Sequence, residues 1–413
     1  MKRVLFLMVI AMACSKESSV GPAQSSTFVR YFNGTNNDQA QALLETSDKQ
    51  GLVILATSTV NTGATPYSKI KLILTDQFGN QKKQALYPSF ANDNNGSVSW
   101  VGRGIAATAS GYVIVGDDIQ SDGTSKLFLL TVNSELDEIE SETMTLPLVN
   151  GNPAKQRKGY GVAVNAAGNF MVLASIPDSI ADNMMLGEFS KTSLKNIWMQ
   201  KYGAGDILQL PNKLFVDNQG ASYWAATTGI KNAAGTALSE TFVRYIKAIP
   251  NRPSAEFADQ LGVAQANEST NDITPYGNGF AIVGSSLGKI VLKRVTEGGS
   301  VLFSQTYPFT DDPTKTLTGN SVCVAQDGGL VMLATLDNLR KDYCLIKIDA
   351  FGSVDATGKT TPTWTKVYGG RFEDIGVSII TTSDGGHVVL GTTTLANVQT
   401  ILLMKTDKEG NIQ

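Results

Sequence analysis

The stretch that decides the fold is Arg371–Gln413, which reads R-F-E-D-I-G-V-S-I-I-T-T-S-D-G-G-H-V-V-L-G-T-T-T-L-A-N-V-Q-T-I-L-L-M-K-T-D-K-E-G-N-I-Q. It contains three apolar, β-branched runs, which are separated by the turn Ser383–Gly386 and a Thr/Asn loop and followed by the turn Asp407–Gly410. Short alternating runs with turn dipeptides between them are typical of antiparallel strands joined as a meander. The stretch therefore predicts three neighbouring strands of one sheet.

The same unit recurs along the whole chain. The glycine that ends the first turn of each unit falls at Gly51, Gly111, Gly168, Gly220, Gly279, Gly329 and Gly386. Two apolar runs follow each glycine, and a fourth segment is clearest at 198–203 and 364–370. Four strands in roughly 40 to 60 residues are typical of a propeller blade. The sequence favours seven blades, and six is the alternative because the fourth unit, around 215–247, is the least regular.

The two ends of the chain together supply one unit. The chain stops at Gln413, where other units begin their fourth strand, and residues 27–34 are similar to residues 364–370. We therefore expect the N-terminal strand to complete the last blade and close the ring, so that residues 27–413 form a single all-β propeller of four-stranded antiparallel blades. Small residues recur where the inner strands would converge, because they allow close backbone approach. They are Ala40, Gly104, Gly159, Gly319 and Gly376.

The first residues have the pattern of an export signal. Lys2 and Arg3 precede an apolar run, Val4–Ala13, that is too short to cross the ~30 Å hydrocarbon layer. The segment ending in Ala13-Cys14 resembles a bacterial lipoprotein signal. The resemblance implies that residues 1–13 are removed, that Cys14 is lipidated and that residues 14–26 form a flexible tether. An ordinary secretory signal and a plain cytosolic N-terminus are the alternatives.

Composition narrows the function classes. The net charge of −3 and the isoelectric point near 5.4 argue against a nucleic-acid partner, and we expect a monomer. Cys323 and Cys344 fall on the first and third strands of one unit. Strands two apart in a sheet are ~9–10 Å from each other, too far for a disulfide, so free buried thiols are expected.

The sequence shows no arrangement typical of catalysis or of a cofactor. The single histidine, His387, opens an expected strand, and no nucleophile or orienting acid accompanies it. A zinc site built on His and Cys lacks ligands. The turns that begin at Asp76, Asp349 and Asp407 have one acid followed by Gly, which predicts tight turns rather than calcium loops. No catalytic residue, metal or cofactor is predicted.

Candidate binding residues are expected on the blade-linking loops and on the loops between second and third strands, which share one face of a propeller. Three of these stretches are long, namely Pro88–Arg103, Ser175–Asn183 and Thr228–Glu240. Loops on a rigid scaffold commonly carry binding residues, although such polar residues occur on any propeller surface. The candidates are Trp100, Arg103, Asp117, Asp118, Arg157, Tyr160, Arg371, Glu373 and Asp374.

The units also carry a family resemblance. The runs G-V-S-I-I-T-T-S-D-G-G-H-V-V-L-G-T-T, L-L-M-K-T-D-K-E-G-N and W-T-K-V-Y-G-G resemble the β-propeller repeats of secreted and lipid-anchored Bacteroidota proteins. The resemblance covers residues 27–413, and it implies a propeller exported to the outer membrane, on its periplasmic or cell-surface side. It carries no catalytic residue with it.

We therefore expect a lipid-anchored envelope module that binds or scaffolds a glycan, a peptide or an envelope protein. One alternative is a carbohydrate-active enzyme, a glycosidase or lyase, with carboxylates, Tyr and Arg at the channel mouth. Two acids facing each other across a cleft, ~5–5.5 Å or ~6.5–9.5 Å apart, would favour it. The other alternative is a scaffold of outer-membrane assembly.

Overall fold

The structure is a computed structural model that describes residues 26–32, 34–61, 66–88, 97–144, 158–176, 183–202, 207–216, 223–232, 238–248, 257–260 and 268–412. The predicted signal peptide, Cys14, the tether and Arg157 lie outside these residues. Within the described ranges there is no helix with the length and apolar character needed to cross a bilayer.

The described residues form 28 strands, which pair in seven four-stranded antiparallel sheets. We number the sheets as blades 1 to 7 in the following order. They comprise β2 (Asn37–Glu45), β3 (Gly51–Val60), β4 (Tyr67–Asp76) and β5 (Gln81–Tyr87); β6 (Ser97–Ala107), β7 (Gly111–Gln120), β8 (Ser125–Asn133) and β9 (Glu138–Met144); β10 (Lys158–Val164), β11 (Phe170–Ile176), β12 (Asn183–Phe189) and β13 (Asn196–Tyr202); β14 (Ile207–Val216), β15 (Tyr223–Asn232), β16 (Leu238–Ala248) and β17 (Phe257–Gln260); β18 (Ser269–Pro275), β19 (Gly279–Ser286), β20 (Lys289–Thr296) and β21 (Val301–Tyr307); β22 (Thr316–Val324), β23 (Leu330–Asp337), β24 (Lys341–Ile348) and β25 (Trp364–Tyr368); and β26 (Asp374–Thr381), β27 (His387–Leu395), β28 (Val398–Thr406) and β1 (Phe28–Phe32).

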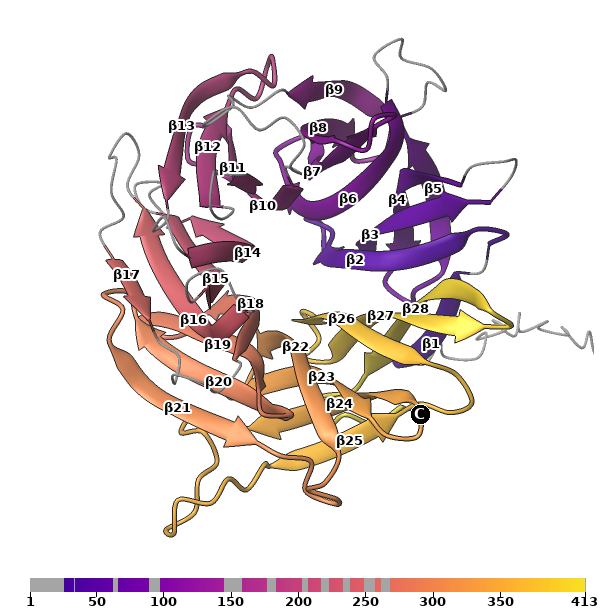
Figure 1. The fold of residues 1–413 in the computed structure, drawn as a ribbon. Helices are drawn as coiled ribbons and strands as arrows, with labels where there is room; N and C mark the ends of the chain where they lie inside the picture. The colour runs from indigo at the N-terminus through magenta and orange to yellow at the C-terminus, as the bar shows by residue number, and fades with distance from the viewer. Residues whose placement is uncertain are drawn as a thin grey trace, which may run out of the picture.

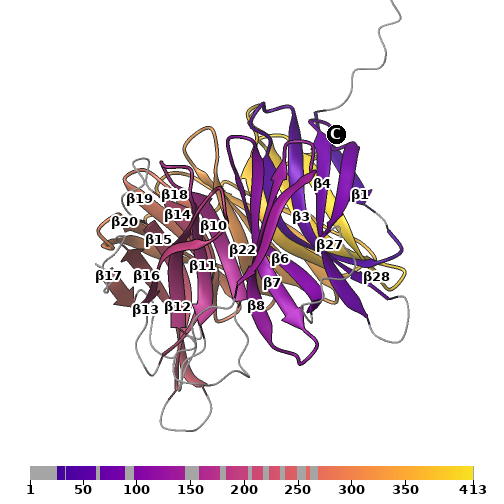
Figure 2. The same ribbon diagram turned by 90° about the horizontal axis from the view of Figure 1, so that it is seen from above.

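The sheets stand in a ring around a central axis (Figure 1), and the same ring is seen from another side in Figure 2. The innermost strands are β2, β6, β10, β14, β18, β22 and β26. Each sheet packs on the next one, and blade 7 packs on blade 1 through contacts of β26, β27 and β28 with β2. The fold is therefore a β-propeller, which confirms the predicted all-β class and the four-stranded antiparallel blades.

The N-terminal strand closes the ring as the sequence predicted. β1 pairs antiparallel with β28, with Phe28 opposite Lys405 and Phe32 opposite Ile401. Both phenylalanines are buried in a cluster that also contains residues of blade 1. A Cβ added at Gly79 of blade 1 would lie 2.5 Å from the Phe28 ring, so this turn fits against the closing strand only as glycine.

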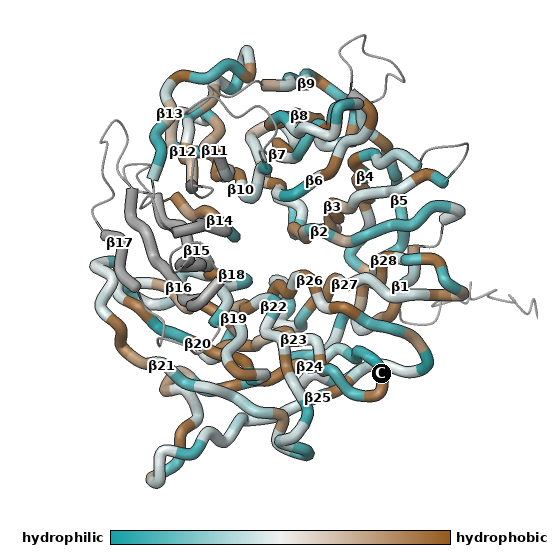
Figure 3. Tube along the Cα trace, viewed as in Figure 1, coloured by the Kyte–Doolittle hydropathy of each residue, from teal (hydrophilic) through white to brown (hydrophobic). Residues whose placement is uncertain are grey.

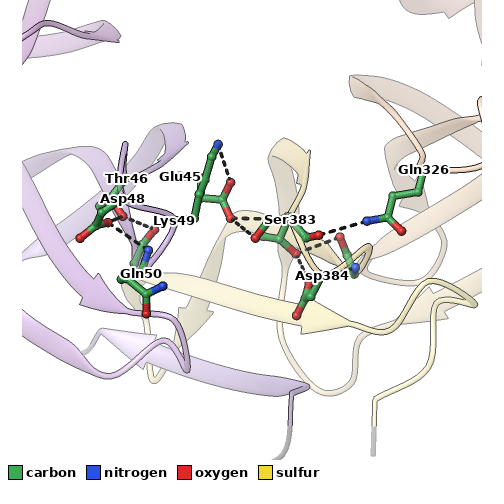
Figure 4. A network of polar contacts seen from close by, with 11 residues as sticks. Glu45, Thr46, Asp48, Lys49, Gln50, Gln326, Ser383 and Asp384 are labelled. Atoms are coloured by element: carbon green, nitrogen blue, oxygen red, sulfur yellow. Dashed lines mark hydrogen bonds and ion pairs between the residues drawn. The ribbon is translucent and has the colours of Figure 1, made fainter.

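Polar contacts between turns reinforce the closure, and Figure 4 shows them from close by. The Oε1 atom of Glu45 in blade 1 accepts hydrogen bonds of 3.4 Å from the backbone N–H and from the hydroxyl of Ser383 in blade 7. On the other side, the Nε2 atom of Gln326 in blade 6 donates to the Ser383 carbonyl at 3.1 Å. The turn of the last blade is thus tied to both of its neighbours.

The core consists of apolar strands buried on both faces. Val53, Ile54 and Leu55 are successive residues of β3, and each has no measurable exposure. A sheet that lies between two other sheets has no solvent face, so its middle strands are continuous apolar runs instead of alternating ones. Figure 3 shows these brown segments within the blades, with polar residues at many of the turns.

Several local predictions are confirmed. His387 opens β27 and is buried, and burial together with Lys347 lowers its pKa to about 4, so that its ring is neutral at physiological pH. Cys323 on β22 and Cys344 on β24 are buried free thiols. Asp76 makes a tight turn, because its Oδ1 atom accepts from the backbone N–H groups of Phe78 and Asn80 at 2.9 and 2.8 Å.

Candidate functional site

Every innermost strand carries a β-bulge at an equivalent place. A bulge leaves one residue unpaired with the neighbouring strand and redirects its side chain. The residues skipped by the pairing are Gln41, Arg103, Tyr160, Asn212, Asn271, Asn320 and Val377. We call these seven the bulge residues.

The bulge residues surround a cavity on the axis of the ring. The cavity has a volume of about 360 Å³, and all seven bulge residues contribute to its lining. The rest of the lining comes from their neighbours on the same innermost strands, among them Lys213 and Asp272. We call this space the channel cavity. The cavity lining therefore combines seven redirected side chains, one from each blade.

In six of the seven blades, the second strand accommodates the bulge with a glycine or an alanine, and blade 4 has Thr227 instead. Ala56, Gly116 and Gly391 lie opposite the residues that precede three of the bulges. A Cβ at Gly116 would lie 2.2 Å from the Val101 carbonyl oxygen, so the backbones meet here as closely as glycine allows. The residue that follows the small one is Thr, Ser or Asp, as in Thr392.

At four of the blade junctions, such a Thr, Ser or Asp side chain ties its blade to the next one. In each case, the backbone N–H of the residue that precedes the bulge donates to a side chain of the preceding blade. The bonds are Ala40 N–H to Thr392 at 3.0 Å, Gly159 N–H to Asp117 at 2.8 Å, Gly319 N–H to Ser285 at 3.2 Å and Gly376 N–H to Thr335 at 3.1 Å. Three of these acceptors are hydroxyls, and only Asp117 brings a negative charge.

Asp117 is paired with a bulge residue. The Nε atom of Arg103 lies 2.9 Å from the Asp117 carboxylate, whose side chain is 2% exposed against 34% for Arg103. Burial raises the pKa of Asp117, whereas Arg103 and the Gly159 N–H act in the opposite direction. The acid is therefore recessed, and the guanidinium is the part of the pair that faces solvent.

A second ion pair of the same kind lies beside the cavity. Lys213 Nζ is 3.0 Å from Asp272, and the side chains are 49% and 6% exposed. The other oxygen of Asp272 accepts from the Ser321 hydroxyl at 2.6 Å and from the Val322 N–H at 3.1 Å. This carboxylate joins blades 4, 5 and 6 and again leaves a cation as the accessible group.

Three amide bulge residues form hydrogen bonds, two of them between innermost strands and one within a blade. Asn271 donates to the Gly319 carbonyl at 2.6 Å, and Asn212 donates in the same way to the Thr270 carbonyl. Asn320 accepts from the Thr335 hydroxyl at 2.9 Å. Each amide uses one of its two polar ends for these ties.

Blades 1 and 7 each have an aspartate near the bulge of the innermost strand. It lies two residues before Ala40 in blade 1 and two residues before Gly376 in blade 7. In blade 1, Asp38 forms an ion pair of 2.6 Å with Lys71, and both side chains are buried. In blade 7, Asp374 is 5% exposed and forms no ion pair with any described residue. Burial raises the pKa of Asp374, with further contributions from the charges of Asp342 and Glu373 and an opposing hydrogen bond from Thr393.

The structure separates the sequence-predicted residues into groups. Arg103 and Tyr160 line the channel cavity, and Asp117 lies behind Arg103. Trp100 and Asp118 are buried away from the cavity lining, and Asp118 accepts hydrogen bonds from Gln120 and Thr143 at 2.8 and 2.7 Å. Arg371 and Glu373 lie exposed in the link before β26, where Asp374 begins the strand. Arg157 lies outside the described residues.

The expectation that these residues lie on loops was wrong for six of them. Trp100 and Arg103 are on β6, Asp117 and Asp118 on β7, Tyr160 on β10 and Asp374 on β26. The strands of blade 2 are longer than expected, with 11 residues in β6 and 10 in β7. Polar residues can remain in these strands because the channel side and the neighbouring blade supply their partners.

The sequence interpretation missed most residues of the cavity. Those that matter most for its polarity are Gln41, Asn212, Lys213, Asn271, Asp272 and Asn320. A usable signal was present, because a polar residue follows a small one in A-Q-A at 40–42, G-R-G at 102–104, G-Y-G at 159–161 and G-N-S at 319–321. The small residue at each of these places marks the bulge.

Comparison with known proteins found similarity among solved structures. No family model matches the sequence, and no curated protein matches it. Among solved structures, the chain is similar to a subtype N10 neuraminidase-like protein of A/little yellow-shouldered bat/Guatemala/060/2010, with 10% identity, a TM-score of 0.45 and coverage of 74% of this chain and 96% of that one.

Two further solved structures are similar at the same level. Prolyl oligopeptidase B from Galerina marginata matches with 11% identity and a TM-score of 0.43, over 86% of this chain and 47% of that one. A thermostable family-43 glycoside hydrolase matches with 12% identity and a TM-score of 0.38, over 68% of this chain and 96% of that one.

Proposed function

We propose that this chain is a lipid-anchored, seven-bladed propeller of the bacterial cell envelope that binds a glycan, a peptide or an envelope protein at its central cavity. The observation that carries the proposal is the channel cavity, into which each blade places one bulge residue. Bulges recur beside binding and active sites, where they redirect side chains. The anchoring part of the proposal rests on the sequence around Cys14.

The electrostatics of the cavity favour binding over hydrolysis. A glycosidase of the usual kind needs two carboxyl groups that flank the scissile bond and are able to exchange protons or attack. Among the described residues, Asp272 lines the channel cavity and Asp117 lies behind it, and each acid is held by a cation and by a backbone N–H group. Both serve to fix the positions of Arg103 and Lys213.

One observation favours the alternative of a carbohydrate-active enzyme. Burial raises the pKa values of Asp374 and Asp342, and the charge of Glu373 raises both further. A carboxyl group that keeps its proton at higher pH is suited to act as a general acid. Hydrolysis or elimination products released from envelope polysaccharides by the protein, but not by an Asp374→Asn variant, would establish this alternative.

The binding proposal is tested by filling the cavity. Val377→Trp adds bulk at a bulge position of the cavity lining without removing a polar contact. Leu339→Trp is the matched control, because Leu339 is 99% exposed and outside the lining. Saccharides and peptides of a solubilised envelope extract are captured on each immobilised protein and compared by mass spectrometry. We expect retention by the parent and the control and its loss in the Val377→Trp variant; equal retention by all three would refute binding at the cavity.

The anchor is tested separately. Cys14→Ala removes the lipidation position, so the protein should move from the membrane fraction to the soluble fraction of the envelope. Continued membrane association of this variant would contradict lipidation at Cys14 and would leave the cavity assay unaffected.

A further inference from the structure

We infer that the channel cavity recognises an acidic sugar unit, with its carboxylate held by Arg103 and Lys213 and its hydroxyls by the amide bulge residues. This inference rests on the proposed binding function and names its ligand class.

The innermost strands of blades 2, 3 and 4 bring two cations and an aromatic residue into the lining of one cavity. A Cβ added at Gly104 would lie 3.1 Å from the Gly161 Cα, and one added at Gly161 would lie 3.2 Å from the Leu214 N. The backbones of β6, β10 and β14 therefore approach as closely as glycine allows. Arg103, Tyr160 and Lys213 adjoin these close approaches, and all three line the cavity. We call these three residues the arc.

The accessible charge of the arc is positive although each cation is paired. Arg103 uses its Nε atom for Asp117, so its two Nη groups are not needed for that pair. The acids are recessed at 2% and 6% exposure, against 34% and 49% for the cations. A guanidinium fork matches the two oxygens of a carboxylate, and an ammonium adds a second charge-assisted hydrogen bond.

The opposite side of the cavity suits hydroxyl groups. Asn271 uses its amide nitrogen for the tie to Gly319, whereas Asn320 uses its carbonyl oxygen for the tie to Thr335. Their remaining ends are thus an acceptor and a donor, and Gln41 adds a further amide to the lining. Sugar hydroxyls both donate and accept, so they match such a mixed set, and the Tyr160 ring adds an apolar surface for a sugar face.

The size of the cavity restricts the ligand. At about 360 Å³ it lies near the lower end of the ~300–1,000 Å³ range of small-molecule sites. A single sugar unit or the end of a chain fits this volume, and a long polymer segment does not.

The test measures binding of D-glucuronate, with D-glucose as its neutral match, by isothermal titration calorimetry on the full chain. The main variant is Arg103→Gln with Asp117→Thr, which gives blade 2 the Gln and Thr that blade 1 has at positions 41 and 57. The new Thr can accept from Gly159 N as Thr392 accepts from Ala40 N, so no buried charge is left unpaired. A second variant, Lys213→Gln, removes the other cation while Asp272 keeps its bonds to Ser321 and Val322.

We expect the parent to bind glucuronate and not glucose, and each variant to lose about tenfold to a hundredfold in affinity with its thermal unfolding preserved. Lys408→Gln is the control, because Lys408 is 72% exposed on a turn, and it should bind as the parent does. Equal binding of glucose, or undiminished binding by the folded double variant, would overturn the inference. So would equally tight binding of a short peptide with a free C-terminal carboxylate.

Failure here is distinguishable from failure of the binding function. If glucuronate does not bind while the Val377→Trp variant still loses envelope ligands that the parent retains, the acidic-sugar inference is wrong and the cavity remains a binding site. If the parent retains nothing from the extract either, both proposals fall.

Discussion

Blades 1 and 7 place an aspartate at the same position of the innermost strand but surround it differently. Asp38 pairs with Lys71, which stands opposite Ala56 on the third strand. The residue at the equivalent position in blade 7, opposite Gly391, is the uncharged Leu402. Burial raises the pKa of Asp374. The repeat thus preserves the backbone and the buried acid, whereas the compensating cation is present in one blade and absent from the other. A buried acid without a cation lowers stability, and proteins tolerate this mostly where the group has a function.

The largest effect is expected from breaking the pair in blade 1. Lys71→Met leaves the Asp38 carboxylate buried without its cation, which should lower the free energy of unfolding by about 3–5 kcal/mol. The double variant Asp38→Asn with Lys71→Met removes both charges and should recover most of the loss. The measurement is the midpoint of denaturant unfolding. If Lys71→Met unfolds at the same midpoint as the parent, the presence of the cation in blade 1 does not change the free energy of unfolding.

A smaller effect of opposite sign is expected in blade 7. Asp374→Asn removes a charge without a cationic partner and keeps an acceptor for Thr393, so it should raise stability at neutral pH by about 0.5–2 kcal/mol. Asp38→Asn is the matched comparison and should destabilise, because it leaves Lys71 unpaired. Destabilisation by both substitutions to a similar extent would show that the two acids are energetically equivalent.

The same variant predicts a pH dependence. An acid whose folded pKa exceeds the ~3.9 of the unfolded chain binds its proton more tightly when folded. Its contribution is therefore most favourable below the unfolded pKa and is lost as the pH rises through the raised folded value. The advantage of Asp374→Asn in melting temperature should be near zero at about pH 4 and grow towards neutral pH. An advantage that is constant over this range would mean that Asp374 titrates normally.

The last prediction concerns proton affinity more than stability, and it copies the cation into blade 7. Leu402→Lys places an ammonium group where blade 1 has Lys71, so it should lower the pKa of Asp374. Stability should not rise, because Leu402 is 5% exposed in the core and its apolar contacts are lost. Titration of the Asp374 carboxyl by NMR measures this shift. A carboxyl that keeps its raised pKa beside the new lysine would show that the surroundings of Asp374, and not the missing cation, set its proton affinity.

The architecture could be predicted because its signals are local and repeated. Turn glycines, apolar runs such as 52–56 and the likeness of residues 27–34 to 364–370 specify strand, sheet and closure. Each of these features depends on residues that are close in the sequence or on the comparison of one unit with another.

The site was harder to predict because it depends on single residues within strands. A bulge shifts Arg103 or Asn320 towards the axis without changing the apolar pattern of its strand. The partner of each side chain also comes from another blade, as Asp117 does for Gly159. Such contacts leave no spacing rule in the sequence, so Arg103 and Tyr160 were found as polar residues and wrongly expected on loops.

The pairing of β1 with β28 joins the earliest of the described strands to be synthesised to the latest. Until β28 has been made, β1 has no partner strand, and the growing row of blades has two open edges that other chains could pair with. The ring therefore gains its last interface only after β28 is made, and deletion of either strand opens the same blade.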